Sequence, residues 1–369
     1  MPSPSHEEFL SRGGFGSLNG IRCLSITAVI WHHTVSGVDW LPITRRGFLG
    51  VDMFFVLSGF LIVTLLLRER DRTGQISLKK FYARRALRIF PVYYGLLAVM
   101  SVLFGVVSPQ GKTAGPFFAE LAYYVSYTAN WVVLHSMFAI AWSLAAEEQF
   151  YLIWPPIERF ARRIAVPLLL IVIFLNQLVN FGYLDSVLEG RMGLARAEIP
   201  MLQATFTPIS LGVLLAHVLH SRAGFERVGW LLSRRWMSPL ALALVIALSD
   251  TAAVDIAGWT RLSIQVAMAV FLASCVVCEN HVLNPMLTLW PVARVGIISY
   301  GVYLYHPLAR HAAEALVSPT LSRLPLALFV ACFLVSVVVA DLSYRYYESW
   351  FLQMKERFHV RKESCSAAA

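Results

Sequence analysis

Three stretches of the chain are apolar all round, and this property limits the folds available to it more than any other. They read PLLLIVIFL (167–175), PLALALVIAL (239–248) and LALFVACFLVSVVVA (326–340). A helix on the surface of a soluble domain keeps a polar face, whereas a helix surrounded by lipid is apolar on every side. Only 14% of the residues are charged, against about 25% in soluble proteins. These features predict an all-α, polytopic membrane helix bundle.

Ten segments are close to the roughly 20 residues that a helix needs to cross the hydrocarbon core. They are 18–36, 47–67, 89–108, 141–158, 164–184, 200–220, 238–256, 260–279, 296–313 and 324–343. A further aromatic segment, 117–136, is only half apolar, and predicts either an eleventh span or a helix lying at the membrane interface. We expect about ten transmembrane helices.

The distribution of Lys and Arg predicts the orientation of this bundle, because cytoplasmic segments carry the excess of positive charge. With a cytoplasmic N-terminus, the inner segments hold 22 of the 31 Lys and Arg residues and the outer ones hold eight. An eleventh span would move the basic segments 159–163 and 221–236 to the outside. Ten spans therefore agree better with the excess of positive charge expected on the cytoplasmic side. We expect both termini on the cytoplasmic side of the cell's inner membrane, and no nucleic-acid partner despite the net charge of +9. The predicted parts are a cytoplasmic segment (1–17), a membrane domain (18–343) and a basic cytoplasmic tail (344–369).

The first span carries ionisable residues near both of its ends. Arg22 lies near the cytoplasmic end, and His32 and His33 lie near the outer end. Ionisable groups within a membrane usually face a bundle interior or a wet cavity. His33 follows Arg22 by 11 positions, which is three helical turns plus about 20°, so both lie on one face roughly 16 Å apart, while His32 points about 80° away. The spacing predicts a functional polar stripe; the alternative is side chains that only reach the two membrane interfaces.

Two later spans carry carboxylates. Asp52 lies inside the second span at close to the depth of His33, where a carboxylate can fix a histidine's tautomer and raise its basicity; the alternative is a structural helix cap. Glu147 and Glu148 lie in the fourth span. We expect Glu147 in the outer third of the membrane, as an acid–base group or one that orients a hydroxyl. Adjacent helical residues point about 100° apart, so one carboxylate is expected to face the cavity. A purely structural pair is the alternative.

Basic and aromatic residues complete the candidate site. Arg85 and Arg88 are at i and i+3, which places them on one helix face near the cytoplasm. Their planar guanidinium groups suit phosphate, although basic residues here also anchor membrane helices. Ser143, Tyr303 and His306 are candidates for lining an acceptor site or channel, with helix packing as the alternative. The histidines and carboxylates lack convincing metal-ligand spacing, so no metal is expected.

Five stretches, taken in order, resemble the acyltransferase-3 family of integral membrane O-acyltransferases. They read LNGIRCLSITAVIWHH, GFLGVDMFFVLSGFLI, FYARRALRIFPVYY, WSLAAEEQFYLIWP and SYGVYLYHP. The match extends over most of the chain, from residue 18 to residue 307, with no family motif between roughly 160 and 290. The family's Arg–His pair on the first helix falls on Arg22 and His33, and its R-x-x-R motif falls on Arg85 and Arg88.

The remaining motif residues also have counterparts. The aspartate of GVDxFF falls on Asp52 and the glutamate of WSLxxE on Glu147. The family opening, LDGLRG, reads LNGIRC here, so Asn19 and Cys23 depart from the pattern at the cytoplasmic side. Some relatives carry an additional esterase-like domain; because the chain ends about 25 residues after its last predicted span, we expect a stand-alone form.

The resemblance implies transfer of an acyl group, usually acetyl, from acyl-CoA to a sugar hydroxyl of a cell-envelope polysaccharide, a lipo-oligosaccharide or a glycosylated small molecule. It implies acyl-CoA as co-substrate and no permanently bound cofactor, with a carbohydrate acceptor and the lipid bilayer as partners. The implied donor-binding residues are Arg22, Arg85 and Arg88. The implied catalytic residues are His33 as base or transient acyl carrier, Asp52 in support, and Glu147 as a second acid–base or positioning group.

Two other function classes stay open from sequence alone. A proton-coupled secondary transporter also places His, Asp and Glu within the membrane, but we find no inverted repeat or pair of interrupted helices in the sequence. A structural subunit would use the polar residues only to hold helices together. The acyltransferase interpretation accounts for both the inner basic pair and the outer acidic and histidine residues.

Overall fold

A computed structural model of the chain describes residues 4–35, 45–194, 196, 198–251, 256–316, 325–356 and 358. Every regular element within these residues is a helix, as predicted. The α-helices are α1 (His6–Ser11), α2 (Ser17–Thr34), α3 (Leu49–Thr73), α4 (Leu78–Val102), α5 (Ala114–Val125), α6 (Ala141–Phe160), α7 (Arg162–Asn180), α8 (Asp185–Met192), α9 (Pro200–Ala204), α10 (Thr207–His220), α11 (Arg222–Leu232), α12 (Met237–Thr251), α13 (Gly258–Val277), α14 (Asn284–Leu287), α15 (Trp290–Ile297), α16 (Ser299–Leu316), α17 (Pro325–Ser343) and α18 (Ser349–Glu356). Two π-helices, η2 (Leu103–Val107) and η5 (Tyr344–Glu348), and two 3₁₀ helices, η3 (Ala129–Trp131) and η4 (Met137–Ile140), complete the fold.

The described residues of each predicted span are mainly helical, although 200–220 is divided between α9 and α10 and 296–313 between α15 and α16. An all-α bundle with helices that could span a membrane is confirmed. Among the described residues, five helices are long and apolar enough to cross a bilayer, or six if the bent pair α11 and α12 forms one span. The helices α2, α6 and α16 are not among these five. They are also the helices that carry Arg22, Glu147 and His306, because ionisable residues lower the hydropathy of a span. The count of ten and the side of each terminus stay predictions.

The ambiguous segment 117–136 is not one continuous helix. It contains most of α5, which has 12 residues and is therefore only about 18 Å long, followed by the short helix η3. Of the predicted tail 344–369, η5 and α18 are described and α18 packs against α4; residues 357 and 359–369 lie outside the described part, as do 1–3 of the N-terminal segment. The domain boundaries stay predictions.

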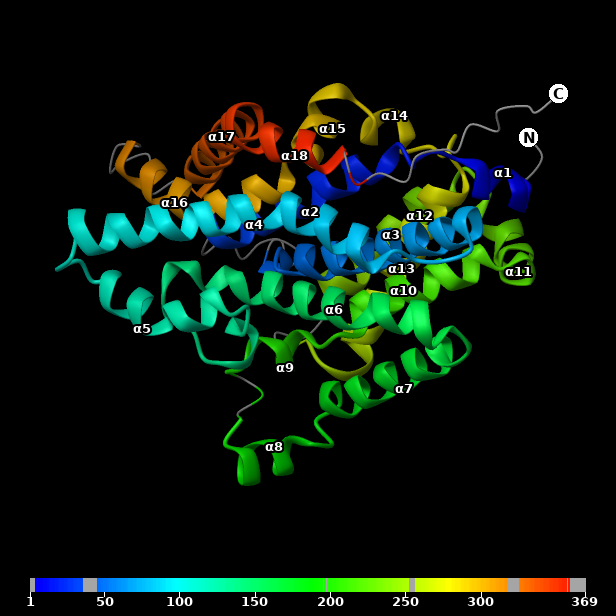
Figure 1. Ribbon diagram of the computed structural model, residues 1–369, viewed down its shortest axis with the longest axis horizontal. Coiled ribbons are helices and arrows are strands. Elements are labelled where there is room, and N and C mark those ends of the chain that lie inside the picture. Colours follow the sequence, from blue (N-terminus) through cyan, green and yellow to red (C-terminus); the bar gives the residue numbers. More distant parts are fainter. Residues whose placement is uncertain are drawn as a thin grey trace.

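The helix α3 runs through the middle of the bundle (Figure 1). Most of its apolar window, 78%, is buried, whereas α7 and the α17 segment bury 17% and 22% of theirs. Apolar side chains of α7 and α17 therefore face outward, as lipid-facing residues do. We call the end of the bundle that holds α1 and α11 the inner end, because both segments are predicted to be cytoplasmic.

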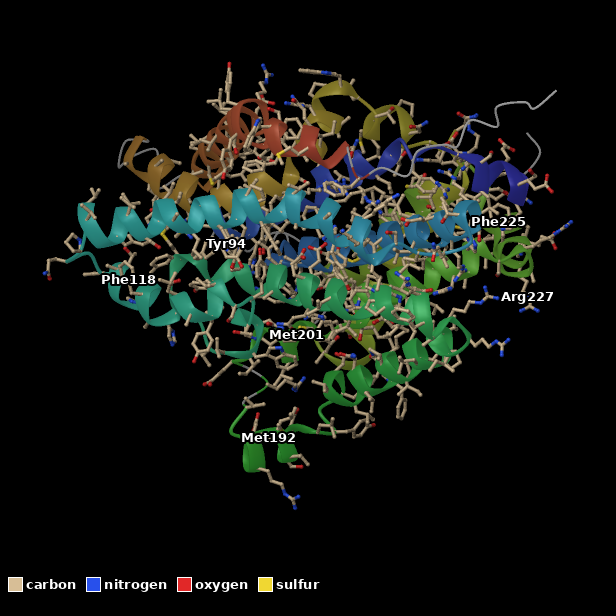
Figure 2. The ribbon with its side chains drawn as sticks, in the orientation of Figure 1. Tyr94, Phe118, Met192, Met201, Phe225 and Arg227 are labelled. Atoms are coloured by element: carbon tan, nitrogen blue, oxygen red, sulfur yellow. The ribbon has the colours of Figure 1, made fainter. Side chains whose placement is uncertain are left out.

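Exposed aromatic side chains gather near the ends of the apolar helices. Trp230 and Trp236 lie at the bend between α11 and α12, and Trp259 begins α13 at the opposite end. Tryptophan is enriched where a membrane helix meets the headgroups. Figure 2 shows the charged side chain of Arg227 extending from α11 at the inner end, while the neighbouring Phe225 is buried. This pattern agrees with a bundle that spans a bilayer.

Glycines, among them Gly50 and Gly59, allow α3 to contact its neighbours closely. A Cβ on Gly59 would lie 2.1 Å from the carbonyl oxygen of Ile209 in α10, and one on Gly212 of α10 would lie 2.1 Å from that of Val56. A Cβ on Gly50 would lie 2.4 Å from a carbonyl oxygen of α2. Small residues at such contacts let membrane helices pack backbone to backbone.

The substitution Gly59→Ala is therefore expected to destabilise the bundle by about 1–3 kcal/mol, because an added methyl group must push two backbones apart. Thermal unfolding in detergent measures the effect. Gly190→Ala in α8 is the matched control, since nothing lies within 4 Å of a Cβ there. Equal melting temperatures for the two variants would contradict the close contact.

Candidate active site

Three cavities adjoin one another inside the bundle. The outer cavity of about 840 Å³ is lined by His33 and Asp52, among others. The middle cavity of about 200 Å³ is lined by Glu147 and by all three candidate arginines, and the inner cavity of about 320 Å³ again contacts Arg22 and Arg88. Tyr303 lines both the outer and the middle cavities. The residues that the sequence singled out at the two ends of α2 therefore lie in a row of adjoining cavities.

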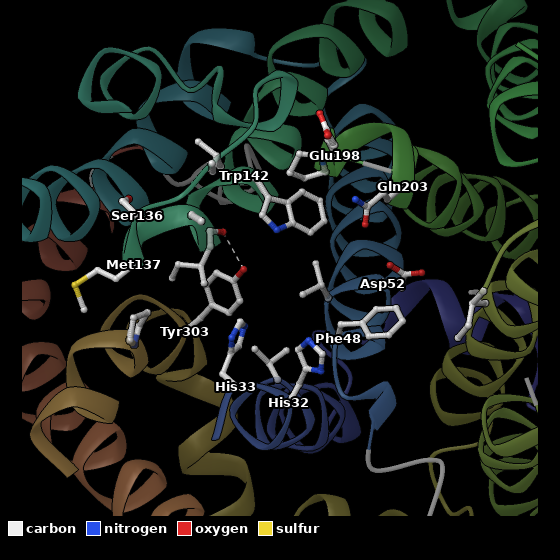
Figure 3. A pocket seen from close by; sticks show the side chains of 18 of the residues that line it. His32, His33, Phe48, Asp52, Ser136, Met137, Trp142, Glu198, Gln203 and Tyr303 are labelled. Carbon is white, nitrogen blue, oxygen red and sulfur yellow. Dashed lines mark hydrogen bonds between the residues drawn. The ribbon is translucent and has the colours of Figure 1, made fainter. Parts of the chain in front are cut away.

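The outer cavity begins where α2 ends. His32 and His33 are in the last turn of α2, and both reach into the cavity, with Tyr303 and Trp142 nearby (Figure 3). We expected His32 to point away; because it lies at the mouth, it also lines the cavity. The ring of His33 packs against His306 of α16, with the ring centroids 4.9 Å apart. His306 is 1% exposed, so the sequence identified two histidines that the fold brings together.

Asp52 lines the same cavity but has a different partner from the one we predicted. Its carboxylate accepts hydrogen bonds from Arg261 Nη2, 3.0 Å from each oxygen, and from Gln265 Nε2 at 2.9 Å. All three residues are buried. The structure shows no hydrogen bond between Asp52 and His33, both of which it describes, because the Asp52 carboxylate instead accepts from Arg261 Nη2 and Gln265 Nε2.

Sequence reasoning missed the role of Arg261 and Gln265. The available signal was their spacing of four residues in the predicted span 260–279, which puts two polar side chains on one helix face. An arginine within a predicted span needs a partner, and so does a carboxylate such as Asp52. Together they form a rigid, neutralised wall of the outer cavity.

Glu147 and Glu148 lie in the middle cavity and not in the outer one that His33 and Asp52 line. Both line it, although one was expected to face away. Arg85 Nη2 is 3.1 Å from Glu148 Oε1 and 3.9 Å from Glu147 Oε1. Glu147 also accepts hydrogen bonds from Ser58 and Tyr151, and the Arg85 guanidinium stacks 3.7 Å from the Tyr151 ring centroid. Arg85 is thus held by two carboxylates and an aromatic ring.

Arg22 and Arg88 have no ion pair or hydrogen bond with any described residue, in contrast to Arg85. Both line the middle and the inner cavities. The nearest acidic lining of the inner cavity is Glu348, which accepts a hydrogen bond from Ser343 Oγ at 3.1 Å. Two partly buried guanidinium groups that form no ion pair with a described residue are costly, and their common environment is the junction of two cavities. This junction is suited to an anionic ligand.

A partition separates the middle cavity from the outer one. The Tyr303 hydroxyl lies 2.6 Å from Ser143 Oγ and donates to the carbonyl oxygen of Ile140 at 3.0 Å. Beside it, Phe55 of the middle cavity packs edge-on against Trp142 of the outer cavity, with centroids 6.1 Å apart. Ser143 and Tyr303, which we considered as acceptor or channel residues, therefore lie at the boundary between the two cavities.

Glu120 is a further residue that sequence reasoning did not identify. It is 6% exposed, and its carboxylate accepts from the backbone nitrogens of His135 and Ser136 and from the hydroxyl of Tyr124. Desolvation by burial opposes ionisation, but these hydrogen bonds outweigh it and lower the pKa of Glu120. The carboxylate thereby fixes the segment 134–140, which covers one side of the outer cavity.

The chain is similar to known acyltransferases. A family model described as an acyltransferase domain matches residues 15–345. The chain is 26% identical to the peptidoglycan O-acetyltransferase OatA of Listeria monocytogenes, over 92% of this chain and 56% of that protein. It is 25% identical to the O-acetyltransferase OatA of Staphylococcus aureus, over 90% of this chain and 56% of that protein.

A further relative is the putative peptidoglycan O-acetyltransferase YrhL of Bacillus subtilis, which is 26% identical over 90% of this chain and 54% of its own length. The chain thus spans about half the length of the curated relatives that it matches. No solved structure shows a significant match.

Proposed function

The chain belongs to the acyltransferase family whose model matches residues 15–345, and from this premise we propose that it transfers an acyl group, acetyl above all, from acyl-CoA to a sugar hydroxyl of a cell-wall polymer. The polymer is suggested by relatives named as peptidoglycan O-acetyltransferases. The observation that carries the proposal is the line of cavities from the unpaired Arg22 and Arg88 to His33. Such a path lets a charged donor stay on the inner side while its acyl group approaches the outer side.

The donor end of this path is the junction of the middle and inner cavities. CoA carries phosphate groups, and Arg22 and Arg88 have the charge and the free donors to bind them. Arg85 has a different role in this proposal. Its contacts with Glu147 and Glu148 make it a structural cation that keeps two carboxylates in the path. The narrow middle cavity would hold the thin pantetheine arm of the donor.

The acyl transfer itself would take place beside His33. The acceptor hydroxyl oxygen forms a bond to the thioester carbonyl carbon while His33 takes the hydroxyl proton. The carbon–sulfur bond then breaks, and the proton passes from His33 to the CoA sulfur. Atoms and charge balance whether His33 acts as base, as written here, or first accepts the acyl group itself.

The outer cavity supports a carbohydrate acceptor. Its volume of about 840 Å³ is within the usual range for ligand sites. The indole of Trp142 offers an aromatic face, and Asn180 and Gln203 line the same space. Sugars present many hydroxyl groups and apolar ring faces, so such a mixed lining suits them. On the α8 side, Arg196 pairs with Asp185 at 3.1 Å, which adds further polar groups to the wall.

Purified protein in lipid vesicles, given acetyl-CoA with and without peptidoglycan fragments, tests the proposal. We expect release of free CoA that depends on the acceptor, together with acetyl ester formation on the sugar. An acceptor panel of muropeptides, other polysaccharides and glycosylated small molecules would identify the acceptor. Absence of acetyl-CoA binding and of CoA release with every acceptor would overturn the proposal.

The partition offers a separate prediction. Tyr303→Phe removes the hydroxyl that joins Ser143 and Ile140, and loss of such a bond costs about 0.5–1.5 kcal/mol. The partition should then open roughly threefold to tenfold more often, which admits water to the thioester. We expect acceptor-independent CoA release to rise by that factor relative to acyl transfer. The control is Tyr305→Phe on the same helix, whose hydroxyl bonds Ser343 away from the outer and middle cavities; a similar rise there would contradict the prediction.

Membership in an acyltransferase family favours the enzyme over the proton-coupled transporter that the sequence left open. The two functions differ in a simple measurement. An acyltransferase consumes acyl-CoA in proportion to acceptor, whereas a transporter moves its substrate without cleaving the thioester.

A further inference from the structure

His306 has one ring nitrogen that is engaged and one that is not. Its Nδ1 lies 2.6 Å from the carbonyl oxygen of Tyr303, one helical turn earlier in α16. A carbonyl oxygen only accepts, so Nδ1 must carry the proton of the neutral ring. The tautomer is therefore set by the backbone, and Nε2 presents a lone pair.

The Nε2 atom of His306 is buried and has no hydrogen-bond partner among the described residues. The residue is 1% exposed, and buried polar atoms without a partner are uncommon in proteins. The side chain lines the outer cavity, and the ring that packs against it belongs to His33. An acceptor is thus available beside the histidine on which the proposed reaction depends.

The separation of the two rings suits a hydrogen bond. Two imidazoles joined by a direct bond of about 2.9 Å have centroids about 5 Å apart, since each nitrogen lies about 1.1 Å from its ring centre. The observed centroid distance is 4.9 Å with an interplanar angle of 42°. A rotation of the His33 side chain would direct one of its N–H groups at His306 Nε2.

We propose that His306 is the positioning residue of His33, the role that we had expected Asp52 to fill. His306 Nε2 accepts the N–H of one His33 ring nitrogen, which leaves the other nitrogen free to take the proton of the acceptor hydroxyl. When His33 becomes an imidazolium, the same bond stabilises it, as a triad's third member does. His306 keeps its own proton on the Tyr303 carbonyl throughout, so the proton that His33 takes leaves only with the CoA sulfur.

This inference rests on the proposed acyl transfer, and three variants separate it from a structural role of His306. His306→Gln places an amide oxygen near the Nε2 position, so it keeps an acceptor for His33. His306→Asn places its amide near the Nδ1 position, so it keeps the bond to the Tyr303 carbonyl but offers His33 nothing. His306→Phe fills the space but keeps neither the hydrogen bond to His33 nor the one to the Tyr303 carbonyl.

Acceptor-dependent acetyl transfer by the three variants in vesicles decides the matter, with thermal unfolding measured alongside. We expect His306→Gln to stay within about tenfold of the wild-type kcat, and the Asn and Phe variants to fall by about a hundredfold or more, with the KM for acetyl-CoA unchanged. Higher activity of the Asn variant than of the Gln variant would show a structural role, and equal activity of all three would also overturn the inference. A wild-type protein without acceptor-dependent transfer would instead overturn the proposed function.

Discussion

His33→Ala is expected to abolish acceptor-dependent acyl transfer while the helix bundle stays folded. General base catalysis typically contributes 10²–10⁴-fold to a rate, so the variant should lose about a thousandfold in kcat. Loss of a covalent acyl carrier would be at least as severe. His33 is only partly buried, in the last turn of α2 beside an open cavity. Removal of its side chain therefore loses few packing contacts, and the melting temperature should change little.

The measurement is the rate of acetyl ester formation and of CoA release by vesicles that contain equal amounts of folded protein. His220→Ala is the matched control, because His220 pairs with Asp71 at the inner end and lines none of the three cavities. Donor binding should be retained in both variants. A His33→Ala protein that transfers acetyl at the wild-type rate would remove His33 from the mechanism, and with it the positioning role of His306.

The helices could be predicted because their signal is local. The apolar stretch 326–340 can satisfy its backbone in lipid only as a helix, and α17 covers it. The stretches 167–175 and 239–248 fall likewise within α7 and α12. The number of spans is harder to predict from local sequence, because polar helices such as α2 depend on neighbouring helices for their burial.

The contents of the site were predictable to a similar extent, but its pairings were not. Arg22, Arg88 and His33 could be recognised because ionisable residues in a membrane helix need a reason to be there. The partner of Asp52 could not, because Arg261 lies 209 residues away in the sequence and only the packing of α3 against α13 brings them together. His306 as the neighbour of His33 depends in the same way on how α16 packs against α2.

The predicted depth of Glu147 in the membrane stays a prediction, but the cavity that it lines has a specific physical reason. We measured that depth from the start of the predicted span at residue 141, taken to lie at the membrane surface. In the structure Ala141 is 0% exposed and the preceding Phe138 is 1% exposed, because η4 turns into the bundle before α6 begins. The helix therefore starts inside the bundle, and Glu147 lines the middle cavity instead of the outer one.

Arg22→Ala and Arg88→Ala are each expected to raise the KM for acetyl-CoA by about tenfold to a hundredfold, since a hydrogen bond to a charged group contributes about 1.5–3 kcal/mol. The kcat should change much less, because neither guanidinium lies at the outer cavity where the acyl group is transferred. Arg85→Ala should behave differently. It leaves Glu147 and Glu148 without their cation, so we expect lower thermal stability as its main effect.

The structure of the donor provides the sharpest control for these variants. Acetyl-pantetheine carries the thioester but no phosphate, so it should bind weakly to the wild type and equally weakly to the Arg22 and Arg88 variants. Arg345→Ala is the matched protein control, because Arg345 is largely exposed and pairs with Asp341 outside the cavities. An equal loss of affinity for both donors in Arg88→Ala would mean that Arg88 acts on the pantetheine arm or on folding. A loss confined to acetyl-CoA would place the phosphates at the junction of the middle and inner cavities, with the acyl end directed along the path to His33.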